Sequence, residues 1–389
     1  MAWGGSIKGA GCWPSAPQRE LIEAIIGRHP VTETWPRYNT SIDLNTVNSG
    51  EARLYPMLAP RLDRQHRADP RFAPLIQSQI RANARYLRNL KEIDRLLADL
   101  REHGIETIVT KGFALLASVY KDGSLRPAAD IDLLIPPGKV LLFCTLAENR
   151  GWKPKHVHPQ FNEKILRYRS TGIDFQLSPF LDVEVHAHFR TELLFEPEVT
   201  TMVWRDARMV QWEGRSWQIP GSSWLLIETI LHGTVWNVVH SMRWIVDGYR
   251  ILERDDAIDW PLIMDLTRRA SLSVIFRNAL EYLSELGARV PDNVLEELKA
   301  RKPSRLERLD YRLRLKPEGF FARYFPREPV NYWLRSKSTG WAKLSGFFTY
   351  FFVSQLGISQ VRSAPRVVGR KFLSRIASLR QLHNAHSDS

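Results

Sequence analysis

Cysteine is scarce in this chain of 389 residues, which contains only Cys12 and Cys144. They lie far apart without Cys-x-x-Cys spacing, which argues against a disulfide framework and against a cysteine zinc site. The N-terminal segment "MAWGGSIKGAGCWPSAP" has no unbroken apolar run, so no signal peptide is predicted. Internal repeats and low-complexity tracts are also missing. These absences favour a folded cytoplasmic protein in a reducing compartment.

Acidic residues are scarce only towards the C-terminus. Residues 301–389 contain 18 lysines and arginines but 5 aspartates and glutamates, whereas residues 1–300 are close to neutral. The net charge of +13 therefore lies in this tail, and any attraction to a polyanion or a membrane belongs there. The apolar content of 44% and the charged content of 25% are ordinary for a globular protein.

The spacing of apolar residues divides the chain into four predicted regions. Residues 1–103 form an N-terminal helical region, including one long helix over 70–102 with apolar residues at three- and four-residue intervals. Residues 104–220 form a small α/β core in which short β-branched strands alternate with helices. Residues 221–300 form a helical domain, and 301–389 form a basic, aromatic helical tail.

Two aspartates interrupt the apolar strand predicted over 129–135, "ADIDLLI". Side chains alternate along a strand, so Asp130 and Asp132 project from the same face. Adjacent carboxylates repel each other unless a cation lies between them, and oxygen ligands suit Mg²⁺ or Mn²⁺. The pair therefore predicts a divalent-cation site. A carboxylate from a neighbouring strand would complete it, and the candidates are Glu184 and, as the alternative, Asp182.

Lys111 and Gly112 stand between a strand predicted over 105–110 and a predicted helix. Backbone N–H groups at the start of a helix favour phosphate, glycine permits close approach, and lysine adds a positive charge. The pair therefore predicts a site for the outer phosphates of a nucleotide. Arg126, four residues before Asp130, is predicted either to hold a phosphate or to stabilise the entry to the strand.

Two histidines share a face of the strand predicted over 182–189, at His186 and His188. A zinc pair would need a third nitrogen or sulfur ligand nearby, and the sequence offers none there. His186 is instead predicted to support the carboxylates as a hydrogen-bonding partner.

Taken in order, these motifs resemble the polymerase-β-like nucleotidyltransferase superfamily. More closely, "TKGFALLASVY", "LRPAADIDLLI" and "VEVHAHF" are similar to motifs of the bacterial uncharacterised nucleotidyltransferase family. The similarity covers most of residues 75–300, and it departs at Ala187, where that family commonly has tryptophan. The resemblance implies an α+β fold with a small mixed β-sheet, N-terminal helices and a C-terminal helical domain.

The resemblance continues over residues 225–252, where the family has a helical histidine followed by a basic-Trp-x-x-Asp pattern. In this chain the matching residues are His232, Arg243 and Asp247. The resemblance implies that all three contribute to nucleotide binding. The residues alone leave two other interpretations open, a core histidine at His232 and an intrahelical ion pair between Arg243 and Asp247.

The resemblance implies a Mg²⁺- or Mn²⁺-dependent transfer of a nucleoside monophosphate from an NTP to an unidentified acceptor, namely a small molecule, peptide or protein. Asp130 and Asp132 would bridge the ions, and Glu184 would bind one ion and favour deprotonation of the acceptor. Lys111 and the Gly112 amide would hold the outer phosphates. The alternatives are a non-catalytic nucleotide-binding or membrane-surface scaffold and an RNA-directed nucleotidyltransferase. Nucleic acid is the less favoured partner.

The uncharged stretch 344–361, "LSGFFTYFFVSQLGISQV", has about the minimum length for a membrane span. Polar residues and two glycines weaken that interpretation. One face at helical spacing is apolar: Trp341, Leu344, Phe348, Phe351 and Phe352. We predict a helix that lies in a membrane interface or binds a protein partner. The interfacial alternative would place the protein at the inner face of an anionic membrane. The alternative is that this face packs on the helical domain.

Overall fold

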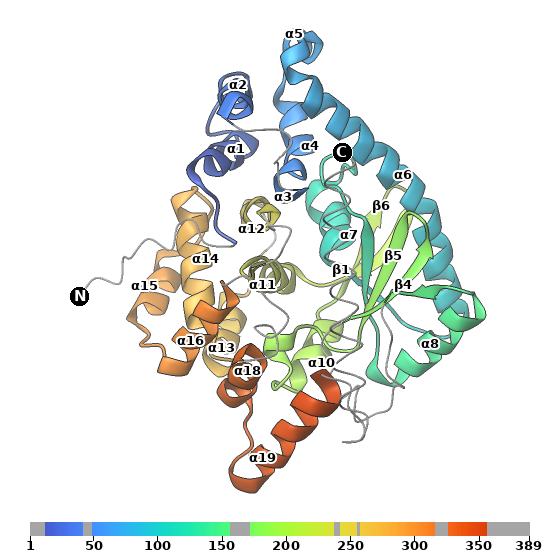
Figure 1. The fold of residues 1–389 in the computed structure, drawn as a ribbon, viewed down its shortest axis with the longest axis vertical. Helices are drawn as coiled ribbons and strands as arrows, with labels where there is room; N and C mark the ends of the chain where they lie inside the picture. Colours follow the sequence, from blue (N-terminus) through green and yellow to red (C-terminus); the bar gives the residue numbers. More distant parts are fainter. Residues whose placement is uncertain are drawn as a thin grey trace.

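The structure is a computed structural model that describes residues 12–41, 49–155, 172–236, 242–254, 257–315 and 326–355. Its architecture is α+β, with helices on both the N-terminal and the C-terminal side of a five-stranded mixed sheet. In Figure 1 the sheet, in green, lies between the long blue helix α6 (Ala73–Glu102) and the yellow and orange helices that follow it in the chain. The predicted fold class is confirmed.

The N-terminal region is helical, as predicted. Its helices are α1 (Ala16–Ile26), α2 (Val31–Ser41), α3 (Ser49–Ala52), α4 (Tyr55–Leu58), α5 (Arg64–Ala68) and α6, with 3₁₀ turns η2 (Ala59–Arg61) and η3 (Pro70–Phe72). Helix α1 ends at Gly27, whose positive φ of 89° suits the last turn of a helix. Helix α6 follows the predicted apolar spacing and buries leucines on one side along its length.

The central sheet has the order β1-β2-β5-β4-β3. Its strands are β1 (Ile108–Thr110), β2 (Asp130–Leu134), β5 (Leu181–His186), β4 (Ile173–Ser178) and β3 (Lys153–Pro154). Strands β2 and β5 are parallel, and the other neighbouring pairs are antiparallel. Two predicted strands are shorter than expected, because pairing begins only at Ile108 in β1 and ends at His186 in β5.

The two faces of the sheet differ in chemistry because side chains alternate along each strand. Ile131, Leu133, Val183 and Val185 are buried on one face. Helix α8 (Val140–Asn149) belongs to the same core, where the Phe143 ring packs on Phe175 of β4 at 5.8 Å between centroids. The polar residues of β2 and β5 consequently share the opposite face, which is the face that carries the candidate site.

The connections around β1 determine how that polar face is closed. Helix α7 (Lys111–Leu115) follows β1 directly, and its predicted continuation is a π-helical turn, η4 (Leu116–Tyr120). An antiparallel hairpin is formed by β6 (Arg208–Trp212) and β7 (Arg215–Ile219).

The C-terminal part is helical, as predicted. The helices of this part are α11 (Ser222–Gly233), α12 (Arg243–Leu252), α13 (Trp260–Arg269), α14 (Ser273–Glu285), α15 (Asp292–Ala300), α16 (Arg305–Arg314), α18 (Glu328–Arg335) and α19 (Gly340–Phe348). Helix α10 (Glu198–Arg205) lies earlier, within the residues predicted as the α/β core. Short turns are η5 (Pro137–Lys139), η6 (Thr191–Leu193) and η8 (Thr349–Gln355). Helices α11 and α12 approach closely because Gly233 has no Cβ, which would lie 2.1 Å from the Trp244 Cβ. One apolar core runs from Cys12 to Leu315, and the division into four regions stays a prediction.

The tail divides its predicted apolar face between packing and exposure. Tyr350 and Phe351 are buried in a small cluster with Tyr332 of α18. Trp341 is 85% exposed and Phe348 is 58% exposed on α19. Among the described residues, no helix is long and apolar enough to cross a membrane. The end of the predicted interfacial helix, 356–361, lies outside the described residues.

Candidate active site

Strand register brings several carboxylates together on the polar face of the sheet. Asp130 of β2 pairs in register with Asp182 of β5, and Asp132 pairs with Glu184. On its other side Glu184 is in register with Asp174 of β4. Cross-strand partners lie about 5 Å apart, so negative charge is concentrated along this face. Asp174 had no distinguishing signal in the sequence, because its role depends on a pairing across strands.

Three of these side chains form a cluster that fits a metal ion. One ligand atom each from Asp132, Glu184 and His186 lies within 4.8 Å of the others. Asp132 and His186 are buried, whereas the Glu184 side chain is 29% exposed. Two carboxylates with one imidazole suit Mn²⁺, and Mg²⁺ through the oxygens. The structure thus groups Glu184, rather than Asp182, with Asp132, and it places His186 within the cluster.

Glycine provides the space that Glu184 needs. A Cβ at Gly172, at the edge of β4, would lie 2.1 Å from the Glu184 Cγ, so a larger residue would displace that carboxylate. Asp182, the alternative ligand, is bonded to Lys155 at 2.6 Å. Asp130 is exposed at the start of β2, two residues from Asp132 on the same face.

The Lys111 ammonium lies inside the acidic cluster. Its Nζ is 2.6 Å from Asp132 Oδ1, 3.2 Å from Glu184 Oε2 and 3.2 Å from His186 Nε2. Burial opposes the charge on Lys111, but the Asp132 and Glu184 carboxylates outweigh burial and raise the pKa of Lys111 above its ordinary value. The structure therefore places this lysine on the carboxylates, whereas the sequence predicted a position on phosphate.

The same interactions change the pKa values of the cluster. Burial raises the pKa of Asp132 to about 7, although Lys111 acts in the opposite direction. Burial would also raise the pKa of Glu184, but Lys111 and His186 hold it well below its usual value. Glu184 and Asp132 raise the pKa of His186 to about 9 against the effects of burial and Lys111. The positive charges around Glu184 thus favour its ionised form.

A buried glutamate on α11 holds the backbone of Lys111. Glu228 accepts a hydrogen bond from the Lys111 N–H at 3.0 Å, and Lys111 has a positive φ of 47°. This conformation is strained for a residue other than glycine and persists only where neighbours impose it. Glu228 was not predicted from the sequence. Its signal was a single carboxylate within the apolar run "WLLIETILHG".

Arg126, Arg243 and Asp247 form the cationic side of the site. Asp247 accepts two hydrogen bonds from Arg126, at 3.0 and 2.9 Å, and one from Tyr120 at 2.6 Å. Burial opposes the charge on Asp247, but Arg126 outweighs burial and lowers the pKa of that carboxyl. Asp247 thus pairs with Arg126, and the intrahelical pair with Arg243 does not form. Arg243 donates instead to the Pro127 carbonyl.

Arg53, between α3 and α4, adds a further positive charge near Asp130. Burial, Arg126 and Arg53 each lower the pKa of Arg243, which shows that the guanidinium groups act on one another. Among the described residues, neither Arg53 nor Arg243 has a carboxylate within ion-pair distance. A guanidinium keeps its proton, so the positive potential persists and favours an anion. Arg53 was not predicted from the sequence, because it lies far from the motifs in sequence.

Gly112 and His232 complete the set of predicted residues. A Cβ at Gly112 would lie 3.0 Å from Arg126 Nη1, so glycine allows this arginine to approach the start of α7. His232 follows Glu228 by one helical turn on α11, and its side chain is exposed. Although this side chain reaches solvent, the protein packed around it and the Lys111 charge lower the pKa of His232, which favours the neutral imidazole.

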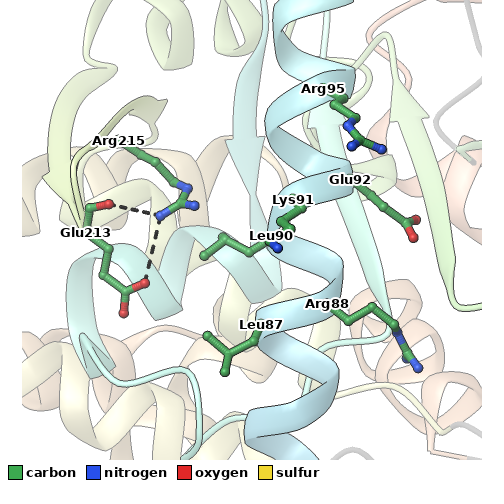
Figure 2. A pocket seen from close by; sticks show the side chains of 8 residues that line it. All are labelled: Leu87, Arg88, Leu90, Lys91, Glu92, Arg95, Glu213 and Arg215. Carbon is green, nitrogen blue, oxygen red and sulfur yellow. Dashed lines mark hydrogen bonds and ion pairs between the residues drawn. The ribbon is translucent and has the colours of Figure 1, made fainter.

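Two pockets lie outside this cluster. One, of about 750 Å³, is lined by charged residues of α6 and the β6–β7 turn, where Arg215 is bonded to Glu213 (Figure 2). The other, of about 790 Å³, lies where Pro136 and His188 follow β2 and β5. Neither pocket is lined by Asp132 or Glu184.

Comparison with known proteins agrees with this location. A family model described as uncharacterised nucleotidyltransferase matches residues 47–288, which is more than half of the chain. The matched segment extends from before Arg53 to beyond Asp247 and so includes the whole acidic cluster. Comparison with curated proteins gave no match.

Proposed function

This chain belongs to the uncharacterised nucleotidyltransferase family, and we propose that it transfers a nucleoside monophosphate from an NTP to an acceptor in a reaction that requires a divalent metal ion. Family membership supports a nucleotidyltransferase-type activity and therefore an NTP substrate. The observation that carries the finer proposal is the cluster of Asp132, Glu184 and His186 beside the cationic side of the site.

The metal would be held by Asp132, Glu184 and His186, with Asp130 as a further ligand from the same face. A divalent ion bound there supplies charge neutralisation for the phosphoryl group under transfer. Asp132 is held rigidly by its strand, because it lies between β1 and β5 in the sheet. Two paired strands thus fix the donor atoms before any ligand binds, which is the preorganisation that electrostatic catalysis needs.

The cationic residues would bind the triphosphate. Arg243 is the first candidate, because its charge is not matched by a carboxylate among the described residues. Arg126 would contribute through the guanidinium edge that Asp247 leaves available, and Asp247 would position it. Gly112 gives Arg126 the space to approach, and His232 lies exposed nearby as a neutral hydrogen-bonding group.

The reaction balances without a further reactant. An acceptor oxygen would form a bond to the α-phosphorus of the NTP, the bond from that phosphorus to the β-phosphate would break, and pyrophosphate would leave. The acceptor proton needs a base, and Glu184 would favour deprotonation of the acceptor, because its carboxylate belongs to the metal cluster. The acceptor would be a small molecule, peptide or protein.

Transfer of label tests this proposal. Protein incubated with Mg²⁺, a cell extract and an NTP labelled in the α-phosphate should yield a labelled acceptor, whereas label in the γ-phosphate should leave as pyrophosphate. Asp132→Asn should lower α-label transfer by at least about 100-fold. Asp182→Asn is the matched control on the neighbouring strand and should retain transfer. Transfer of γ-label, or full activity in Asp132→Asn, would contradict the proposal.

A separate observation concerns location. Trp341, Leu344 and Phe348 are exposed on one face of α19, and the tail that carries this helix holds the excess positive charge of the chain. We propose that this face contacts an anionic membrane surface, because exposed aromatic groups with nearby cations suit an interfacial helix. The buried Tyr350 and Phe351 would then anchor the following turn to α18.

A further inference from the structure

Lys111 is placed where a cation would bind. Its Nζ lies 2.6 Å from Asp132 and 3.2 Å from both Glu184 and His186, and these are the three residues of the candidate metal cluster. An ammonium at this point neutralises the buried Asp132 carboxylate, which would otherwise carry the full cost of desolvation. The apparent role of the lysine is therefore that of a counter-ion.

The ammonium and a divalent ion exclude each other from this position. A Mg²⁺ or Mn²⁺ ion lies about 2.0–2.2 Å from its ligand atoms. The three ligand atoms already lie within 4.8 Å of one another, so an ion held among them would overlap with or strongly repel the Lys111 Nζ. The lysine must therefore leave before the three residues can act as ligands together.

We propose that Lys111 is an internal stand-in for the catalytic metal ion, which releases the carboxylates when metal and NTP bind together. This inference rests on the proposed function. It assigns Lys111 two positions, one on Asp132 and Glu184 in the free protein and one on the phosphates of the bound nucleotide. Metal alone must compete with the ammonium, whereas an NTP supplies a new anionic partner for it. Metal binding and NTP binding consequently favour each other.

The backbone around Lys111 suits such a movement. Glu228 fixes the Lys111 N–H at 3.0 Å, and the strained φ of 47° sets the direction in which the side chain leaves the main chain. The backbone can therefore stay in place while the flexible four-carbon side chain changes its direction. Gly112 leaves the neighbouring position open beside Arg126, where the cationic side of the site begins.

Binding of Mn²⁺ without NTP, followed by electron paramagnetic resonance, tests the competition. Lys111→Met should bind Mn²⁺ about tenfold or more tightly than the wild type, because the competing positive charge is gone. The matched control is Lys155→Met, which removes a lysine bonded to Asp182 of the neighbouring strand β5 at the same 2.6 Å distance. This control should bind Mn²⁺ as the wild type does. Equal or weaker binding by Lys111→Met would overturn the inference.

A second measurement uses the wild-type protein and so does not depend on the folding of a variant. Mass spectrometry would quantify the acetylation of Lys111 by an amine-specific reagent, with exposed Lys155 as the internal reference. Lys111 should be protected in metal-free protein and lose protection severalfold when Mn²⁺ is added. Protection that is unchanged at saturating Mn²⁺ would overturn the inference, as would an absence of Mn²⁺ binding. Transfer of α-label by the wild type would then show whether the proposed function itself still holds.

Discussion

At the scale of single residues, Asp247 holds Arg126 of the site in place through hydrogen bonds. It accepts hydrogen bonds from Arg126 and Tyr120, and all three side chains are buried. Removal of one member of a buried ion pair leaves an uncompensated charge, which commonly costs about 3–5 kcal/mol. Loss of Asp247 should therefore lower the stability of the fold and also leave Arg126 without the group that positions it.

We therefore expect Asp247→Asn to lower the free energy of unfolding by about 3 kcal/mol and to weaken NTP binding at the same time. Denaturation by urea and calorimetric titration would measure the two effects. Asp265→Asn is the control, because Asp265 pairs with Arg268 on an exposed helix surface. If Asp247→Asn were as stable as this control, the buried pair would not have the supporting role assigned to it.

The sequence allowed the prediction of Asp130, Asp132 and Glu184 because alternation along a strand is a local property. The positions of Lys111 and Asp247 could not be predicted in the same way. Each has its partner on another element. Lys111 contacts Asp132 on β2 and Glu184 on β5, and Asp247 contacts Arg126, which precedes β2. Glu228 and Arg53 were missed for the same reason, since only the folded chain brings them to the site.

At the scale of secondary-structure elements, a buried ion pair joins the turn after β5 to the end of α16. Arg314 donates to Glu192 at 2.6 Å, and Arg190 lies 3.4 Å from the same carboxylate. Burial would raise the pKa of Glu192, but Arg190 and Arg314 outweigh burial and lower it far below its usual value. A carboxylate with a lowered pKa stabilises the fold at neutral pH, and this contribution falls once the unfolded chain binds the proton.

The pH dependence of stability follows from the lowered pKa of Glu192 in the folded protein. Glutamate titrates at about 4.3 in an unfolded chain, so wild-type protein should lose stability progressively as the pH falls from about 5. Glu192→Gln should be less stable at pH 7 and lose less between pH 5 and pH 3.5. Urea denaturation of both proteins at several pH values would measure the difference. Parallel losses in both proteins would show that Glu192 is not the group responsible.

Helix α19 exposes two aromatic side chains, Trp341 and Phe348. We expect the full-length chain to sediment with vesicles that contain anionic lipid and to stay in solution with neutral vesicles. A variant with Trp341→Ser and Phe348→Ser should lose binding severalfold without a large change in melting temperature, because both side chains are exposed. Tyr350→Ala is the contrasting variant, since Tyr350 is buried and its loss should lower stability. Unchanged sedimentation of the double variant would contradict the membrane proposal.

At the scale of the whole molecule, the described residues form a main apolar core and a second, small apolar cluster. The core runs from Cys12 to Leu315, while the tail has its own small cluster of Tyr332, Tyr350 and Phe351. The nucleotidyltransferase family model matches residues 47–288, and this segment falls within the sequence span of the main core. A chain that ends after residue 335 should therefore keep the site, but it would lose α19 and the buried Tyr350 and Phe351 of the tail cluster.

The elements themselves were largely predictable, because helices and strands of this chain have clear apolar periods. The long helix, the hairpin and the alternation in β2 and β5 all follow from local spacing. The π-helical turn after α7 was not predicted, and the strand predicted over 105–110 begins only at Ile108. Both features depend on how α7 packs between the sheet and α11. The sequence left open whether the apolar face of the tail is packed or exposed. In the structure Phe351 is buried, whereas Trp341 and Phe348 are exposed.

The central claim is that the acidic cluster binds a metal ion together with an NTP. Thermal unfolding with ATP, GTP, CTP or UTP, each with and without Mg²⁺, tests it most directly. A ligand at about 100 times its dissociation constant adds about 2.7 kcal/mol to stability, so at least one NTP should raise the melting temperature by a few degrees. This rise should require Mg²⁺ and vanish in Glu184→Gln. No rise with any NTP, or an equal rise without Mg²⁺, would contradict the account.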